Sequence, residues 1–579
     1  MTTNTPDAGN HRPPHPSPAR RPAPPSNDGA ARRGPSFSPA GGAPGTLTAV
    51  PHADQSQTTQ KGAPVTYPGP PRPVEVSATP LAELAAQLGV PVPRTADAAA
   101  SLPGVRGITH DSRAVRPGDL YAALPGARAH GADFAAQAAT LGAVAALTDP
   151  AGADRVAEAG LLPLVVENPR AAMGELAATI YGHPGTDLLQ IGITGTSGKT
   201  TTAYLVEGGL KSVRSTGLIG TVEMRIGDER IKSERTTPEA TDLQALFAVM
   251  RERGVEAVAM EVSSHALVLG RVDGCVFDVA VFNNLSPEHM EFHSGMEDYF
   301  QAKAQLFTHA RSKQGVVNLD DEYGRRLVSQ CAAAGYPVVT FSAEGHPDAG
   351  WRAEDVEVGP LGSTLTVVGP QGQRIAARAP LPGAFNVANT LAAVVTLAVA
   401  GIDPQTAADG VAAVPGVPGR LERVDAGQKY LAVVDYAHKT DAVESVLRAL
   451  RKVTENKLHI VLGCGGDRDR TKRMPMGAAA ARFADTAILT SDNPRGEDPL
   501  AILATMLAGA ADVPAHERGD VAVFEDRAAA IAAAVARARP GDTVLVAGKG
   551  HEQGQDIAGV VRPFDDRLVL REAIEQTQG

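Results

Sequence analysis

Residues 188–201 read LLQIGITGTSGKTT, an apolar run that leads into glycines, a lysine and two threonines. The apolar half is typical of a buried strand, and a helical pattern begins directly after the lysine. Glycines let the backbone curl so that its N–H groups and the helix N-terminus face an anion. The order predicts a phosphate-binding loop in which Lys199 adds positive charge and Thr200 offers a hydroxyl to Mg²⁺. Ile193 stands where the strict pattern has glycine, so the loop is a variant, and a plain glycine turn is the alternative interpretation.

Two further apolar runs predict strands that end beside this loop. Residues 255–260 lead into Glu261, and residues 276–282 are followed by a polar segment that contains His289. In an open parallel sheet, ligands sit outside the carboxyl ends of the strands. Glu261 and His289 are therefore candidate Mg²⁺ ligands that face the phosphates. Taken singly, each is more often a loop cap or a surface residue, and only their joint placement with the phosphate loop gives the metal role equal weight.

A lysine lies on the apolar stripe of the helical pattern at residues 296–310. Lys303 shares that stripe with Phe300, Leu306 and Phe307. A buried amine would have a lowered pKa and would be reactive enough for carbamylation into a carboxylate-like metal ligand. The alternative is a stem that packs while the charged head reaches solvent, and the pattern alone favours this second interpretation.

The composition of the chain excludes several classes of protein. Its 579 residues are 43% hydrophobic and 21% charged, which is ordinary for folded globular domains. The net charge of −11 argues against a nucleic-acid partner. Three widely separated cysteines exclude a disulfide scaffold and a Cys-rich zinc site. No apolar run approaches the roughly 20 residues that cross a bilayer, so we expect no membrane insertion.

The chain divides into four parts by composition and pattern. Residues 1–75 hold 17 of the 44 prolines and few aliphatic residues, so we expect a disordered extension. Residues 76–186 predict a small α/β domain, and residues 187–417 predict a parallel sheet with crossover helices. The same pattern restarts in residues 418–579, with strands expected at 430–434, 459–462, 486–490 and 543–547.

Ordered motifs run through most of the chain. They are THDSR (109–113), GDL (118–120), the loop at 195–201, TTPE (236–239), MEVSSH (260–265), NLSPEH (284–289), LPGAFN (381–386), PGRLE (418–422), DYAH (435–438), DNPR (492–495) and GKGHE (548–552). With these motifs the chain, from about residue 105 to 570, resembles the Mur ligases, ATP-dependent amide-forming enzymes of peptidoglycan precursor synthesis. The resemblance implies three domains: a small N-terminal α/β UDP-binding domain, a central P-loop ATPase-type parallel-sheet domain and a C-terminal Rossmann-like domain.

The resemblance also implies a reaction and the residues that serve it. The expected reaction joins diaminopimelate to UDP-N-acetylmuramoyl-L-alanyl-D-glutamate through an acyl phosphate, with ATP as co-substrate and Mg²⁺ as cofactor, in a cytoplasmic monomer. The expected catalytic residues are Lys199, Glu261, His289 and a carbamylated Lys303, and the expected metal ligands are Thr200, Glu261, His289 and Lys303. ATP would be bound by Gly195, Thr196, Ser197, Gly198, Lys199, Thr200, Thr201, Asn386, Arg420, Asp435 and His438. The UDP-linked substrate would be bound by Ser112, Thr236, Thr237, Ser263 and Arg271.

Selection of the amino acid is expected in the C-terminal domain, at Arg468, Asp492, Asn493, Pro494, Arg495, Gly548 and Glu552. Diaminopimelate carries a carboxylate and an ammonium at its distal end. An arginine pairs well with that carboxylate, and Glu552 would accept the ammonium. Lysine lacks the distal carboxylate and would leave an arginine unpaired, so we expect Arg495 to reject it.

Two positions depart from the family pattern, and three other functions stay open. Leu269 replaces a glutamine found in some members, and Lys439-Thr440 replaces a frequent Thr-Pro. The alternatives are a Mur ligase that adds lysine or D-alanyl-D-alanine, a folylpolyglutamate synthetase, and a catalytically idle nucleotide-sugar sensor. The DNPR segment argues against the first and the segment at 111–113 against the second. The presence of all four expected catalytic residues argues against the third.

Overall fold

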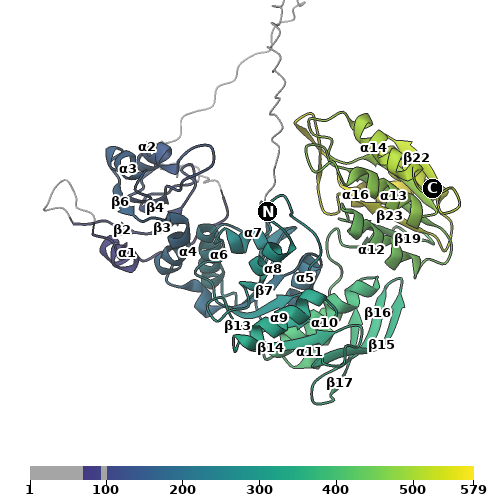
Figure 1. Ribbon diagram of the computed structural model, residues 1–579, viewed down its shortest axis with the longest axis horizontal. Helices are drawn as coiled ribbons and strands as arrows, with labels where there is room; N and C mark the ends of the chain where they lie inside the picture. The colour runs from purple at the N-terminus through teal and green to yellow at the C-terminus, as the bar shows by residue number, and fades with distance from the viewer. Residues whose placement is uncertain (1–68, 93–100, 579) are drawn as a thin grey trace, which may run out of the picture. The chain divides into compact units, whose positions relative to one another are not determined.

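Three α/β sheets organise the part of the chain that the computed structural model describes, residues 69–92 and 101–578 (Figure 1). This confirms the α/β fold class. Most of the predicted proline-rich extension, residues 1–68, lies outside the described residues. None of the helices in the described ranges is long and apolar enough to span a membrane.

The first sheet has four parallel strands in the order β3-β4-β5-β6. Its core is formed by side chains such as Leu120, Leu147 and Leu164, which are fully buried. The elements of this region are β1 (Thr79–Pro80), α1 (Leu81–Leu88), β2 (Gly104–Val105), β3 (Gly107–Thr109), β4 (Asp119–Ala122), η1 (Gly131–Phe134), α2 (Ala135–Thr140), β5 (Ala145–Thr148), α3 (Ala153–Glu158), β6 (Leu162–Val165) and α4 (Pro169–Ile180).

The folded N-terminal region includes Arg72, a residue that lies within the predicted extension of residues 1–75. Arg72 donates two hydrogen bonds, of 2.7 and 2.6 Å, to the two carboxylate oxygens of Asp119 at the start of β4. The Arg72 and Asp119 side chains are only 11% and 2% exposed. Arg72 is therefore part of the folded N-terminal region, because a buried carboxylate needs its cationic partner.

The central sheet has eleven strands in the order β10-β9-β8-β11-β7-β12-β13-β14-β15-β16-β17. The middle of the sheet, from β8 to β15, is parallel, as predicted. Both edges carry antiparallel strands, which the predicted parallel sheet with crossover helices does not include. The strands are β7 (Leu189–Thr194), β8 (Thr216–Ile219), β9 (Glu223–Ile226), β10 (Glu229–Lys232), β11 (Ala257–Glu261), β12 (Phe277–Phe282), β13 (Ser312–Asn318), β14 (Val338–Ser342), β15 (Trp351–Gly359), β16 (Gly362–Val368) and β17 (Arg374–Ala379).

Helices cover both faces of this sheet and form two separate cores. One core includes Leu205 and Leu391, and the other includes Leu246 and Phe300. The helical elements are η2 (Pro184–Asp187), α5 (Lys199–Lys211), α6 (Ala240–Glu252), α7 (Ser264–Val268), α8 (Met296–Ala304), α9 (Glu322–Ala333), α10 (Ala384–Val399) and α11 (Pro404–Ala412). Helix α8 ends at Ala304, six residues before the predicted end at 310.

The third sheet has six strands in the order β18-β19-β23-β20-β21-β22, all parallel except β18. Its strands are β18 (Glu422–Arg423), β19 (Leu431–Asp435), β20 (Leu458–Cys464), β21 (Thr486–Ser491), β22 (Asp520–Phe524) and β23 (Thr543–Ala547). The strand β22 was not predicted. The remaining elements are α12 (Thr440–Arg451), α13 (Arg473–Phe483), α14 (Pro499–Ala511), α15 (Arg527–Arg537), the hairpin β24 (Gly554–Ile557) and β25 (Val560–Pro563), and α16 (Asp566–Gln578).

Candidate active site

The predicted phosphate loop joins β7 to α5 at the carboxyl edge of the central sheet. Gly195 and Gly198 have φ values of 151° and 83°, conformations that favour glycine. A Cβ on Gly198 would also lie 2.4 Å from Oδ1 of Asn389. The loop therefore needs both glycines for its backbone conformation, and Gly198 also for the close approach of Asn389.

The lysine of the loop folds back over it. Nζ of Lys199 donates hydrogen bonds of 2.8 and 2.9 Å to the carbonyl oxygens of Gly195 and Thr196. Burial lowers the pKa of the Lys199 amine. The ammonium is thus held where it can exchange these carbonyls for phosphate oxygens.

Two residues that the sequence reasoning did not single out hold the loop in place. Asn284, just after β12, accepts a 2.8 Å hydrogen bond at Oδ1 from the N–H of Ser197 and donates from Nδ2 to the Ser197 carbonyl. Asn389 on α10 lies against Thr202 Oγ1 at 3.4 Å and donates 2.9 Å to Oδ1 of Asn386. Asn386, predicted to bind ATP, therefore contacts the loop through Asn389. The sequence feature that could have identified Asn284 is an amide side chain just after a predicted strand beside the loop.

Glu261 ends β11, the immediate neighbour of β7. Its Oε1 accepts hydrogen bonds from Thr200 Oγ1 at 3.0 Å and from the N–H of Thr221 at 2.7 Å. The hydroxyl of Thr221 donates to Oε2 at 3.2 Å. Glu261 and Thr200 are both buried, so the structure places two oxygen ligands suited to Mg²⁺ in contact beside the phosphate loop.

His289 lies in the segment after β12, the other neighbour of β7. Its φ of 58° is unusual for a residue with a side chain. Nε2 lies 3.2 Å from Glu288, and Nδ1 lies 3.3 Å from Glu291. Burial lowers the pKa of His289, and the positive charges of Lys199 and Lys303 lower it further. Within residues 69–92 and 101–578, no three His, Cys, Asp or Glu side chains form a metal-binding cluster.

Lys303 contradicts the interpretation that the residue pattern favoured, a head group that reaches solvent. The residue is 1% exposed, and Nζ donates a 2.9 Å hydrogen bond to the carbonyl of Gly195 in the phosphate loop. Nζ also lies 4.7 Å from the centroid of the Tyr299 ring. Burial, together with the charge of Lys199, places the pKa of Lys303 well below its ordinary value. Apolar spacing cannot show this, because a snorkelling lysine and a buried one occupy the same helical stripe.

The residues predicted for the UDP-linked substrate lie in two places. Ser112 follows β3 and donates a 2.7 Å hydrogen bond to Gln137 on α2. The second group surrounds the start of α7: Thr237 Oγ1 donates to the Glu261 carbonyl at 2.8 Å and accepts from the N–H of Ser263 at 3.2 Å.

Arg271 and Thr236 complete this second group. Arg271 forms a 2.9 Å ion pair with Glu239 and lies 3.5 Å from the Thr237 carbonyl. Thr236 lies 3.0 Å from the hydroxyl of Thr221, which in turn contacts Glu261. The four residues predicted from the central sheet are thus linked to Glu261 through short hydrogen-bonded paths.

The three ATP residues predicted from the C-terminal region have different surroundings. Arg420 donates to Thr200 Oγ1 at 3.2 Å. Both oxygens of Asp435 accept backbone N–H groups, from Leu421 at 2.7 Å and from Ala437 at 2.8 Å. His438 donates from Nδ1 to the Tyr436 carbonyl at 2.7 Å, which leaves Nε2 available. Asp435 therefore shapes the loop, whereas Arg420 and His438 keep donor or acceptor atoms that can reach a ligand.

The residues predicted for the amino acid meet at the carboxyl ends of β21 and β23. Asn493 Nδ2 donates to Oε2 of Glu552 at 2.8 Å. Arg495, with a φ of 51°, donates from Nη1 to the Gly466 carbonyl at 2.7 Å after β20. A Cβ on Gly548 would lie 2.7 Å from Oδ2 of Asp492, so the two loops touch.

Two members of this predicted set do not offer side-chain contacts to it. Arg468 follows the end of β20, and its side chain is exposed and has no recorded hydrogen bond or ion pair to the described residues. Pro494 contributes its carbonyl, which accepts the N–H of Glu497 at 3.0 Å, and a Cβ on Gly466 would lie 2.0 Å from that oxygen. The structure thus brings Asn493 together with Glu552 and Asp492 together with Gly548, whereas the Arg495 side chain contacts Gly466.

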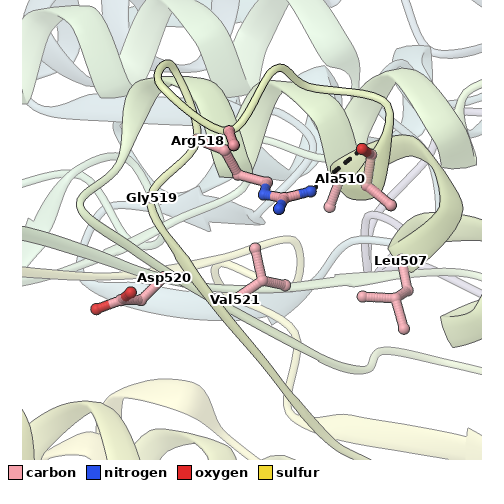
Figure 2. A pocket seen from close by; sticks show the side chains of 8 residues that line it. Leu507, Ala510, Arg518, Gly519, Asp520 and Val521 are labelled. Atoms are coloured by element: carbon pink, nitrogen blue, oxygen red, sulfur yellow. Dashed lines mark hydrogen bonds between the residues drawn. The ribbon is translucent and has the colours of Figure 1, made fainter.

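A cavity of about 360 Å³ lies elsewhere, between the end of α14 and the start of β22 (Figure 2). Leu507, Ala510 and Val521 line it together with Arg518, whose Nη1 donates to the Ala511 carbonyl at 3.2 Å. This is the amino end of β22, whereas the predicted ligand-binding residues follow the carboxyl ends of the neighbouring parallel strands. The cavity is therefore separate from the candidate site.

A phosphate loop at the carboxyl edge of one parallel sheet, with a polar cluster at the carboxyl edge of a second, defines a P-loop α/β enzyme that uses a nucleoside triphosphate. Residues 104–181 match the Mur ligase family catalytic domain, residues 193–397 the Mur ligase middle domain, and residues 419–550 the Mur ligase glutamate ligase domain. This chain belongs to the Mur ligase family, which confirms the resemblance.

Relatives in this family match nearly the whole chain. The UDP-N-acetylmuramoyl-L-alanyl-D-glutamate–2,6-diaminopimelate ligase of Streptomyces avermitilis is 84% identical over 516 residues, covering 89% of this chain and all of that protein. The protein of the same name from Corynebacterium glutamicum is 48% identical over 467 residues, covering 79% of this chain and 89% of that one. A solved structure of a UDP-N-acetylmuramoyl-L-alanyl-D-glutamate–2,6-diaminopimelate ligase has a TM-score of 0.63 at 33% identity, with 87% of this chain and 100% of that chain covered.

Proposed function

We propose that this chain uses ATP to join diaminopimelate to UDP-N-acetylmuramoyl-L-alanyl-D-glutamate in peptidoglycan precursor synthesis. The observation that carries the proposal is the pairing of an ATP-type phosphate loop with a second sheet whose edge presents both an arginine and a glutamate, Arg495 and Glu552. Relatives named for this reaction match the chain at 84% and 48% identity. The family membership and the site chemistry therefore favour the same reaction.

The reaction needs an activated carboxylate. A carboxylate oxygen of the dipeptide attacks the γ-phosphorus of ATP, ADP leaves, and an acyl phosphate forms. The amine of the incoming amino acid then attacks the acyl carbon, inorganic phosphate leaves, and the amine loses a proton. Lys199 supports the first step, because its Nζ lies 2.8 Å from the Gly195 carbonyl in the phosphate loop, where an ammonium can neutralise the charge of the transferred phosphoryl group.

Thr200 and Glu261 have the chemistry of a Mg²⁺ site. Their oxygens are buried and 3.0 Å apart, and hard oxygen donors are the ligands that Mg²⁺ prefers. A bound Mg²⁺ ion would supply charge neutralisation for the phosphates. His289 and Lys303 are the proposed residues of a second site, and both are near enough to Lys199 for its charge to lower their pKa values.

Lys303 serves this proposal as a carbamate. A neutral amine is required to attack CO₂, with loss of a proton, and burial favours the neutral form of Lys303. Lys303→Ala should then lose nearly all turnover, and short carboxylic acids in the buffer should restore part of it. Intact mass at mildly alkaline pH should show the added CO₂. A variant that no carboxylic acid restores, together with an unmodified and active wild type, would contradict this role.

Arg495 is the proposed selector for diaminopimelate. Its Nη1 is anchored on the Gly466 carbonyl, and its backbone is held by hydrogen bonds at Asp556 and Ala558, so the guanidinium is fixed at the edge of the site. A fixed guanidinium pairs with the distal carboxylate of diaminopimelate, and with lysine it would have no such partner.

The test compares catalytic efficiencies for diaminopimelate and lysine. The wild type should prefer diaminopimelate by a hundredfold or more, and Arg495→Ala should lose most of that preference through KM while the KM for ATP changes little. Arg518→Ala is the matched control, because this exposed arginine lines the cavity at the opposite edge of the sheet. Equal use of both amino acids by the wild type would overturn the assignment of diaminopimelate as the substrate. An unchanged ratio of catalytic efficiencies in Arg495→Ala would overturn the assignment of Arg495 as the selector.

We also propose that the enzyme works in the cytoplasm as a monomer. Its three cysteines, Cys275, Cys331 and Cys464, are buried and free, which suits a reducing compartment. Its substrates are small molecules, and the predicted site residues all come from one chain. Sedimentation of the purified protein across a range of concentrations tests the oligomeric state.

A further inference from the structure

Lys549 is a fully buried lysine between the two loops that hold the amino-acid residues. It is the second residue after the end of β23, and the residue is 0% exposed. A buried ammonium costs several kcal/mol unless it is paired and hydrogen-bonded. Lys549 meets that requirement at two of the predicted site residues: Nζ donates 3.0 Å hydrogen bonds to Oδ1 of Asn493 and to Oε2 of Glu552.

The bonds around Lys549 fix the orientation of both partners. Asn493 Oδ1 also accepts the N–H of Asp556 at 3.0 Å, so the amide nitrogen must point the other way, toward Oε2 of Glu552 at 2.8 Å. Oε2 of Glu552 thus accepts two hydrogen bonds. No described residue donates to Oε1, and the Glu552 side chain is 33% exposed. One carboxylate oxygen is held inward while the other is left for a ligand.

We infer that Lys549 is a positioning residue for the amino-acid substrate. It pulls Oε2 of Glu552 inward, keeps Asn493 in one orientation, and so aims Oε1 at the distal ammonium of the bound amino acid. It does not touch the substrate itself, because the whole residue is buried. This inference rests on the proposed function, and it adds a residue that acts through Glu552.

A double-variant cycle tests whether Lys549 acts through Glu552. The variants are Lys549→Met, Glu552→Gln and the two combined, each assayed for kcat and for the KM values of diaminopimelate and ATP. Lys549→Met should raise the KM for diaminopimelate at least tenfold and change the KM for ATP less than twofold. The combined variant should lie within about twofold of Glu552→Gln, because two changes that remove one interaction do not add.

Asp542→Asn is the matched control. Asp542 is buried, lies next to the amino end of the same strand β23, and contacts His459 at 3.2 Å. The Asp542→Asn substitution should lower the melting temperature. It should leave the ratio of the KM for diaminopimelate to the KM for ATP unchanged. If Lys549→Met does not fold, Lys549→Gln takes its place, with a selective rise of at least fivefold expected for diaminopimelate.

The possible results distinguish a failure of the Lys549 role from a failure of the proposed function on which that role rests. Equal rises in both KM values, effects that multiply in the combined variant, or an unchanged KM in a folded Lys549 variant would overturn the role of Lys549 alone. A wild type whose phosphate release does not respond to diaminopimelate would overturn the proposed function, and the Lys549 role with it. A selective and non-additive rise in the KM for diaminopimelate would support both.

Discussion

At the scale of single residues, two of the predicted site residues hold strained backbones. His289 and Arg495 have φ values of 58° and 51°, in a region that costs of order 1 kcal/mol or more for a residue with a side chain. Around Arg495 the strain is held by hydrogen bonds on both sides: its N–H donates to Asp556 at 3.0 Å, and its carbonyl accepts from Ala558 at 2.7 Å. The hairpin β24–β25 therefore fixes the backbone from which the proposed selector projects.

Lys199→Ala should abolish phosphoryl transfer while binding of the UDP-linked dipeptide stays within about threefold. The lysine lies against the phosphate loop, whereas the predicted residues for the nucleotide sugar lie after β3 and around α7. Phosphate release and isothermal titration measure the two properties separately. Lys211→Ala, an exposed lysine at the far end of the same helix α5, should change neither. Binding that falls as far as turnover would show that the two sites are not separable.

His551 should make the enzyme less stable in mild acid. Burial lowers its pKa to about 4, and its Nδ1 has no hydrogen-bond partner among the residues that the structure describes. Between pH 4 and the unfolded value near 6.5, the unfolded chain binds the extra proton, so stability falls as pH falls through this window. The loss from this group is at most about 3.4 kcal/mol, at 1.36 kcal/mol per pKa unit.

Melting temperatures between pH 7 and pH 4.5 check this expectation. His551→Phe should lose less stability over the interval than the wild type, because it cannot be protonated. His516→Phe, at a side chain that is 81% exposed, should follow the wild type. Parallel curves for all three proteins would contradict a buried neutral His551.

At the scale of elements, prediction succeeded where the chain is buried on both sides. The strands β7, β11, β12, β20, β21 and β23 are continuous apolar runs, and each begins and ends within about two residues of its predicted bounds. β22 was missed because Asp520–Phe524 is a half-exposed edge strand without such a run. α8 was predicted too long because Leu306 and Phe307 stay buried in the turn after the helix, so the apolar periodicity outlasts the helix itself.

One buried ion pair attaches helix α16 to the C-terminal sheet. Asp566, the first residue of α16, accepts two 2.7 Å hydrogen bonds from Arg527, and both side chains are 0% exposed. Arg527 also donates to the carbonyls of Ser491 and Ala547, the last residues of β21 and β23. The pair therefore connects α15 and α16 to the two strands that carry the amino-acid loops.

Asp566→Asn should destabilise the protein by about 3–5 kcal/mol, because it leaves a buried guanidinium without its counter-charge. Thermal or urea unfolding measures the loss. Glu297→Gln breaks the exposed pair with Arg326 and should leave the unfolding midpoint nearly unchanged, because solvent screens that pair. A combined Arg527→Met and Asp566→Leu variant should recover part of the loss. Similar costs for the buried and exposed pairs would contradict the anchoring role.

Across the molecule, the sequence placed the candidate site residues at the carboxyl edges of two parallel sheets. Strand ends in a parallel sheet meet at one edge, which is why Thr200 and Glu261 could be placed together before their 3.0 Å contact was known. The sequence could not show how deeply a side chain is buried. The buried amino groups of Lys303 and Lys549 are therefore known only from the structure. Likewise Arg468, which has the right charge and position, turns out to be exposed.

Arg72 marks the N-terminal limit of the segment that the fold needs. Removing residues 1–68 should leave the melting temperature unchanged and turnover within about twofold, because that segment is poor in aliphatic residues. Removing residues 1–73 also deletes Arg72 and leaves the buried carboxylate of Asp119 without its cationic partner. This should lower the free energy of unfolding by about 3–5 kcal/mol. Thermal unfolding of the two truncations decides between them, and Arg72→Met in the full chain should reproduce the larger loss. Equal melting temperatures for the two truncations would show that Arg72 is not an anchor and would return the boundary to residue 75.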